Sequence, residues 1–76
     1  MPRNQIIATW LSFMITAFRQ TTGLSVAQFI KLDRNYGLVR FLAKNYELLH
    51  YYDTDYVIND VKTYISGQGG NIREAA

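Results

Sequence analysis

The first part of the chain has the pattern of a helix that is apolar around more than half of its circumference. Asn4 is placed to N-cap a helix that begins at Gln5, because its side-chain oxygen can accept a free backbone N–H. Gly23 is placed to end this helix, since glycine enters the left-handed C-terminal conformation without steric cost. At about 100° per residue, the polar positions form one narrow stripe. The apolar positions are Ile6, Ile7, Trp10, Leu11, Phe13, Met14, Ile15, Ala17 and Phe18.

A second helix is predicted over residues 26–34 by the most specific local signal in the chain. Ser25 and Gln28 have the spacing of a capping box, in which each side chain satisfies the backbone donor of the other. Leu24 and Phe29 flank the same turn at the positions of a hydrophobic staple. Residues 35–37, which end in glycine, are typical of a turn.

The third predicted helix covers residues 38–51 and is apolar on more than one side, as in a central helix with several neighbours. Asn45 conflicts with this pattern, because it falls inside the apolar arc. Either its amide is satisfied within the core or the helix bends there.

Residues 53–55 are typical of a turn or an N-cap, and the residues after them favour a fourth helix, because Val57, Val61, Tyr64 and Ile65 recur at helical spacing. The alternative is a short extended piece over residues 56–58, before a helix capped by Asn59. Glycine at position 67 ends the pattern. We therefore predict an all-α protein, a compact bundle of about four helices over residues 1–66, followed by a flexible Gly-rich tail over residues 67–76.

Composition narrows the class of protein further. The chain has 76 residues and a formal net charge of +2, and it contains no cysteine and a single histidine, His50. Disulfides, thiolate metal sites and multi-histidine zinc sites are thereby excluded. The longest apolar run, residues 6–18, is too short for a membrane span of about 20 residues, and no clear cleavage site follows it. We expect a cytoplasmic protein.

Catalytic chemistry has only a weak basis in the sequence. His50 lies near Asp53 and Asp55, but a histidine at the end of a helix usually contacts the last carbonyls and the helix dipole. The acidic cluster does not follow the order of ligands of an EF-hand, and no phosphate-binding loop motif occurs. We expect a non-enzymatic protein without catalytic residues, metal or cofactor.

Charged residues are segregated along the chain. Residues 19–44 carry five cations and a single acid, whereas residues 47–60 carry only acids besides His50. A helix–turn–helix DNA-binding regulator that uses Arg34, Arg40 and Lys44 is therefore one hypothesis. Its recognition helix would begin with the largely apolar residues 38–41, which are poorly suited to reading base edges. A bundle whose solvated faces are merely basic is the simpler interpretation.

The apolar excess favours contact with another protein chain or with a second copy of this one. Two helices that are apolar over most of their circumference exceed what a small bundle buries. Tyrosine is enriched in protein interfaces, although clustered tyrosines can equally cap the end of a bundle with their hydroxyls in water. The predicted partner-binding residues are Trp10, Met14, Phe18, Tyr51, Tyr52 and Tyr56.

Several short motifs within residues 22–65 resemble a family of short bacterial proteins of unknown function. The motifs are TGLS at 22–25, YG at 36–37, FL at 41–42, YELLH at 46–50, YVI at 56–58, DV at 60–61 and YI at 64–65. Members of that family are often encoded beside ADP-ribosyltransferase-like proteins, in an arrangement similar to a toxin–antitoxin pair. The resemblance implies that this chain neutralises such a partner, and it supplies no catalytic residues.

Overall fold

The computed structural model describes residues 2–75, and the elements in this range are all helical. The α-helices are α1 (Arg3–Thr22), α2 (Val26–Tyr36), α3 (Leu38–Lys44), α4 (Tyr46–Leu49) and α5 (Thr54–Gly67), and a 3₁₀ helix, η1 (Ile72–Ala75), follows. The predicted all-α class is confirmed. No helix within residues 2–75 is both long enough and apolar enough to cross a lipid bilayer.

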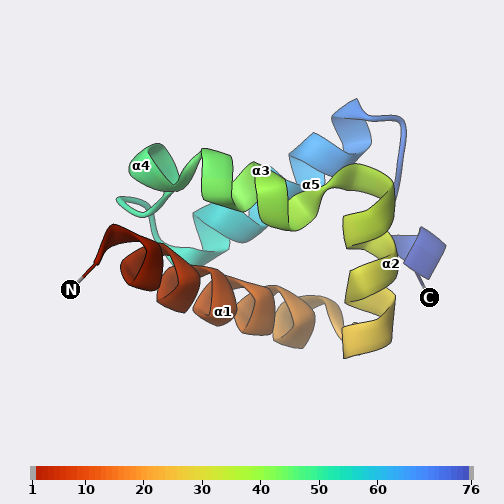
Figure 1. Cartoon of the computed structure of the whole chain (residues 1–76). Helices are drawn as coiled ribbons and strands as arrows, with labels where there is room; N and C mark the ends of the chain where they lie inside the picture. The colour runs from red at the N-terminus through yellow and green to blue at the C-terminus, as the bar shows by residue number, and fades with distance from the viewer. Residues whose placement is uncertain (1, 76) are drawn as a thin grey trace.

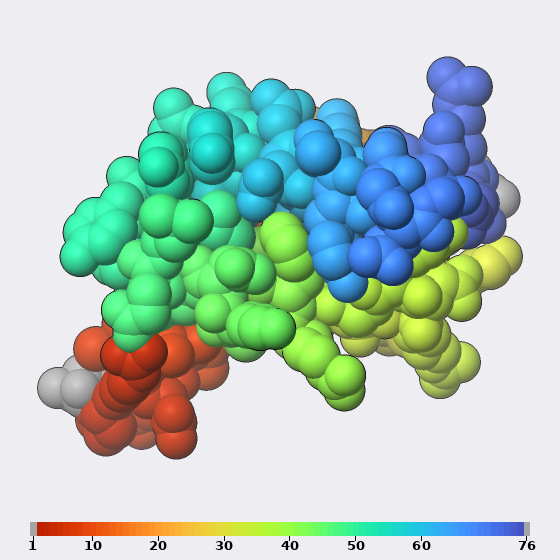
Figure 2. Space-filling model, turned by 90° about the horizontal axis from the view of Figure 1, so that it is seen from above, coloured from red at the N-terminus to blue at the C-terminus, as the bar shows by residue number. Residues whose placement is uncertain are grey.

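The helices form an elongated bundle of 37 × 22 × 20 Å. Helix α1 packs against α3 and α5, α2 stands across one end and contacts α3, and η1 packs on α2 (Figure 1). Helix α4 and the start of α5 lie at the end of the bundle opposite the C-terminal segment (Figure 2). The two ends of the molecule are therefore built from different parts of the sequence.

One hydrophobic core runs through all of these elements. Leu32 of α2 and Leu38 of α3 are completely buried, and no polar or charged residue among those described is buried. The core thus contains only side chains whose removal from water stabilises the fold. Its members are Met14, Phe18, Leu24, Phe29, Leu32, Leu38, Leu42, Leu49, Val57, Ile58, Val61, Ile65 and Ala75.

The local signals around α2 are confirmed. Ser25 Oγ accepts from the Gln28 backbone N–H at 3.1 Å, and Gln28 Oε1 accepts from the Ser25 backbone N–H at 2.8 Å. Gly23 and Gly37 have left-handed φ values of 76° and 65° and end α1 and α2. Helix α2 continues to Tyr36, two residues beyond the predicted end, because the left-handed residue is Gly37 itself.

The predicted start of α1 is wrong. The helix begins at Arg3, and Asn4 lies inside it. The Pro2 carbonyl accepts from the backbone N–H groups of Gln5 and Ile6 at 3.1 and 3.2 Å. Proline suits this place because its fixed φ is compatible with a helix start.

A single helix over residues 38–51 is also wrong, and the bend considered at Asn45 is what the structure shows. Asn45 has φ −102° and ψ 13° and separates α3 from α4. Its side-chain amide donates to the Phe41 carbonyl at 2.8 Å. The conflict in the apolar pattern is thus resolved by the interruption of the helix, and the amide of the half-buried Asn45 is satisfied outside the core.

Helix α5 begins earlier than its apolar pattern indicated. Asp53 Oδ1 accepts from the Tyr56 backbone N–H at 2.9 Å and caps the helix. Residues 56–58 are helical, so the extended alternative capped by Asn59 is wrong. The Asp53 cap favours the helical conformation of residues 56–58, because its carboxylate accepts a backbone N–H that has no partner within the helix.

The C-terminal segment differs from the flexible tail that its glycines predicted. Residues 72–75 form η1 against α2, with Ala75 buried and Ile72 packed on the core. The Tyr36 hydroxyl donates a hydrogen bond to Glu74. A Cβ atom on Gly70 would overlap the Tyr36 ring, so the close approach of this segment requires glycine.

Replacement of the N-cap residue by S25A should lower the free energy of unfolding by about 1 kcal/mol, because the Gln28 backbone N–H loses its acceptor, Ser25 Oγ. Urea denaturation measures this change. The matched control is S12A on the exposed surface of α1, which should change stability by less than about 0.5 kcal/mol. Equal effects of the two substitutions would contradict the role of the capping box.

Two leucine substitutions should separate the core from the surface. L32A removes a side chain that is completely buried and should cost about 2 to 5 kcal/mol. L48A removes a side chain that is 59% exposed and should cost less than about 0.5 kcal/mol. Thermal denaturation followed by circular dichroism compares them, and a larger loss from L48A would contradict the assigned core.

Candidate functional site

A chain of aromatic contacts joins the start of α1 to α4. Trp10 meets the Tyr46 ring edge-on, with ring centroids 5.2 Å apart. Tyr46 stacks on His50 at 4.4 Å, and His50 contacts Tyr51 at 4.1 Å. Tyr46 and His50 can stack because they are four residues apart, which places them one helical turn from each other on the same face.

Large exposed hydrophobic side chains are concentrated beside this aromatic chain. Leu48, Tyr51, Tyr52 and Tyr56, which we call the aromatic end, are 59%, 80%, 45% and 48% exposed. Tyr52 and Tyr56 stack on each other at 4.2 Å. Half of the eight large hydrophobics exposed among residues 2–75 thus lie within nine consecutive positions. Such clustering is typical of an interaction surface.

The predicted partner-binding residues are divided by the structure. Tyr51, Tyr52 and Tyr56 belong to the aromatic end, whereas Trp10 is half-buried and contacts Tyr46. The prediction is wrong for Met14 and Phe18, because both are buried in the core and are not available to a partner. Phe18 packs edge-on against Phe29 of α2 at 6.0 Å, so this face of α1 is already covered.

Five of the eight exposed large hydrophobics were absent from that prediction, and the two most exposed of them are Leu48 and Phe13. Leu48 and Phe13 are each 59% exposed. Phe13 lies on the side of α1 that also carries Ile6, seven residues earlier, and this side borders the polar stripe of the helix. Leu48 is exposed because α4 is a separate short helix, which the apolar pattern alone did not indicate.

The residues around His50 have structural partners. His50 Nδ1 lies 2.6 Å from the Tyr46 carbonyl, and the Asp53 carboxylate caps α5. Within the described part of the chain, no group of three or more metal-ligating histidine, aspartate or glutamate side chains is present. The geometry gives His50 a role in holding the aromatic chain together.

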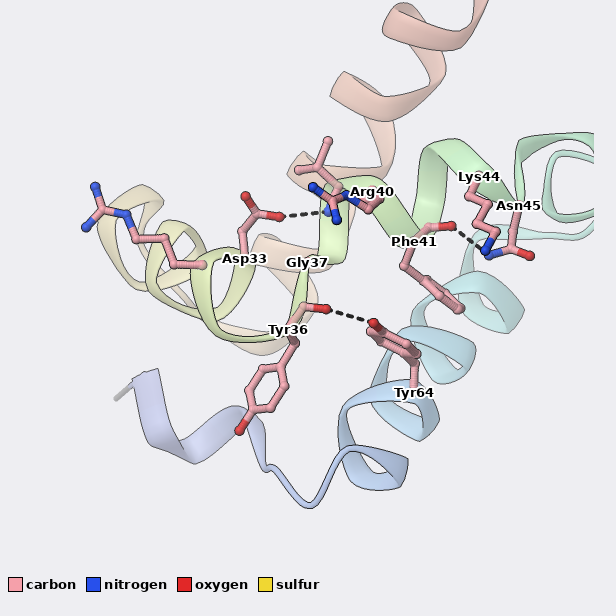
Figure 3. A pocket seen from close by; sticks show the side chains of 10 residues that line it. Asp33, Tyr36, Gly37, Arg40, Phe41, Lys44, Asn45 and Tyr64 are labelled. Carbon is pink, nitrogen blue, oxygen red and sulfur yellow. Dashed lines mark hydrogen bonds between the residues drawn. The ribbon is translucent and has the colours of Figure 1, made fainter.

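A second surface feature, which we call the basic groove, lies between the α2–α3 connection and α5. It has a volume of about 620 Å³, and Arg34, Arg40 and Lys44 all line it. Figure 3 shows Phe41 projecting from α3 toward Tyr64 of α5, with Arg40 and Lys44 also on α3. The three cations of the DNA-binding hypothesis are therefore brought together.

Hydrogen bonds hold the walls of the basic groove in place. Phe41 and Tyr64 stack with centroids 4.2 Å apart and planes 22° apart, and the Tyr64 hydroxyl donates to the Tyr36 carbonyl at 2.8 Å. Asp33 Oδ1 accepts from the Val39 backbone N–H at 2.8 Å, which satisfies a free donor at the start of α3. The single acid of the groove is thus committed to a structural contact.

The connection between α2 and α3 bears on how this groove is used. Gly37 alone joins the two helices, whereas a helix–turn–helix has a turn of about three or four residues. Leu38, the first residue of α3, is completely buried, and α3 is only seven residues long. With these features, α3 is a weaker candidate for a DNA-recognition helix than the sequence pattern indicated.

The hydroxyl of Tyr36 links the edge of the groove to the C-terminal segment. The hydrogen bond to Glu74, partial desolvation and the charge of Glu74 all raise the pKa of Tyr36 above its ordinary value of 10.0. Because the pKa is raised in the folded state, the stabilising contact is complete below pH 10.0 and is lost as pH rises through the raised pKa.

Substitution E74Q should return the pKa of Tyr36 toward its ordinary value, since the neutral Gln amide accepts a weaker hydrogen bond from the Tyr36 hydroxyl and carries no negative charge. NMR titration of ring-labelled tyrosine measures this pKa. E47Q is the matched control, because Glu47 pairs with Arg3 and not with Tyr36. An unchanged Tyr36 pKa in E74Q would contradict the docking of η1.

The fold and the two surfaces define a small all-helical protein with an exposed aromatic end and a cationic groove. Residues 9–67 match a family described as "Protein of unknown function (DUF3791)". The match covers most of the chain, so the protein belongs to this uncharacterised family. No curated protein and no solved structure matches it.

Proposed function

We propose that the protein is a non-enzymatic protein-interaction module that binds a partner chain through its aromatic end. The observation that carries the proposal is the concentration of exposed Leu48, Tyr51, Tyr52 and Tyr56 on one end of the bundle. Tyrosine rings bury much apolar area on binding and lose little conformational freedom, which makes them effective contact residues.

The chemistry around the aromatic end specifies the surface that would fit it. The charged residues that follow it in sequence, Asp53, Asp55 and Asp60, are all acidic, and Asp53 and Asp55 are exposed. The nearby Arg3 is paired with Glu47. A complementary surface therefore has an apolar centre with basic residues at its rim. A second copy of this chain would bring the same acids together, so like charges oppose a symmetric pairing of aromatic ends.

The resemblance noted in the sequence supports a particular kind of partner. An ADP-ribosyltransferase-like enzyme encoded beside this chain is the proposed target, and the protein would act as its antitoxin-like neutraliser in the cytoplasm. In such a complex the aromatic end would anchor the interface, while α1, α3 and α5 supply a rigid base for it.

The alternative function is a DNA-binding regulator that uses Arg34, Arg40 and Lys44. It is favoured by the gathering of these cations in one groove. The steep salt dependence expected of phosphate contacts distinguishes it from an apolar protein contact.

Substitution Y51S should weaken binding to the purified adjacent ADP-ribosyltransferase-like protein at least about tenfold, because it removes the most exposed ring of the aromatic end. Isothermal titration calorimetry measures the affinity. The matched control is F13S, which removes another exposed aromatic ring far from the aromatic end in sequence and should leave affinity unchanged. Equal losses in both variants, or no binding by the wild-type protein, would contradict the proposal.

A further inference from the structure

The basic groove combines two kinds of binding group that the aromatic end does not have. Its cations Arg34, Arg40 and Lys44 are exposed, and within residues 2–75 none of them forms an ion pair. Its floor holds the stacked rings of Phe41 and Tyr64, each half-buried. Cations recognise phosphate oxygens, and a stacked pair presents a further ring face to a planar ligand.

The groove is formed in advance of any ligand. The Tyr64 hydroxyl donates to the Tyr36 carbonyl, which holds the Tyr64 ring at its outer end, and the Phe41 ring stacks on Tyr64. The Asn45 amide donates to the Phe41 backbone carbonyl and so fixes the end of α3. The Asp33 carboxylate is held by the Val39 backbone N–H. A ligand therefore meets an aromatic wall that is already ordered, which lowers the entropic cost of binding on that side of the groove.

From this arrangement we propose that the basic groove is a binding site for a nucleotide, a small ligand that carries both phosphate and an aromatic base. The base would stack against the Phe41–Tyr64 pair, and the phosphates would contact Arg40 and Lys44, with Arg34 at the groove's α2 side. The volume of about 620 Å³ lies within the range of about 300 to 1,000 Å³ that is usual for small-molecule sites.

The charge distribution favours a free nucleotide over a nucleic-acid strand. Strand-binding proteins follow the backbone with a long cationic track that covers several nucleotides. Here the cations end at Lys44, and the following charged residues are Glu47, Asp53, Asp55 and Asp60. Phosphates that extended past the groove toward this acidic segment would be repelled, whereas a ligand confined to the groove would not.

The site is independent of the proposed protein contact. The groove is lined by α2, α3 and Tyr64 of α5, and none of the four residues of the aromatic end lines it. Binding of a nucleotide and binding of a partner chain are thus separable measurements, and loss of one carries no information on the other.

The test is an NMR titration of the isotope-labelled full chain with ADP, and separately with adenosine and with pyrophosphate. We expect ADP to produce saturable shifts centred on residues 34–45 and 64, with an affinity at least about tenfold higher than that of either half, since only ADP engages both rings and cations. K44Q should weaken ADP binding several-fold. F41L should weaken ADP more than pyrophosphate, because it removes a stacking ring and leaves the charges.

K31Q is the matched control, because Lys31 is an exposed lysine of α2 that does not line the groove. It should leave the affinity for ADP unchanged at constant ionic strength. Three outcomes would overturn the proposal: no saturable shifts with millimolar ADP, equal losses in K31Q and K44Q, or tighter binding of an eight-nucleotide single strand than of ADP. The first outcome would mean that the groove has no defined site for ADP, the second that ADP responds only to the overall charge of the protein, and the third that the groove binds nucleic acid.

Discussion

The hydrogen bond from the Asn45 side chain to the Phe41 carbonyl is the interaction on which both surface features depend. An amide in the apolar arc of a helix has to find a partner, and here the partner is the carbonyl one turn earlier. The backbone leaves helical geometry at Asn45, so α3 ends and α4 begins in a new direction. Upstream of this point Phe41 faces Tyr64 in the groove, and downstream Tyr46 faces Trp10 and begins the aromatic chain.

Small size imposes a second constraint. A domain of 76 residues has a high ratio of surface to volume, and its helices share one small core. Met14 and Phe18 belong to that core, whereas the neighbouring Phe13 faces water. The exposed hydrophobics therefore arise from geometry in part, and their concentration at the aromatic end, rather than their number, is what points to binding.

The elements that could be predicted from sequence are those fixed by local chemistry. The capping box at Ser25 and the left-handed glycine at position 23 depend on neighbouring atoms alone, and both are present as expected. The buried face of α1 could not be chosen in advance, because apolar residues cover more than half of it and only contact with α3 and α5 distinguishes Met14 from Phe13. The packing of the C-terminal segment on α2 could not be predicted from its glycines, since a glycine suits both a flexible tail and a close contact such as that of Gly70 with Tyr36.

The groove could be anticipated only in part, for the same reason. Arg34, Arg40 and Lys44 were identified by their charge, but Tyr64 reaches Phe41 from more than twenty positions away in sequence through the packing of α5. Charge alone is equally compatible with a solvated face, with a DNA contact and with a ligand site. Packing favours the ligand site, because it places the stacked aromatic pair beside cations that form no ion pair within residues 2–75. The one acid that lines the groove, Asp33, accepts a hydrogen bond from the Val39 backbone N–H. The binding surfaces of this protein are therefore made by residues that packing brings together and not by any single sequence motif.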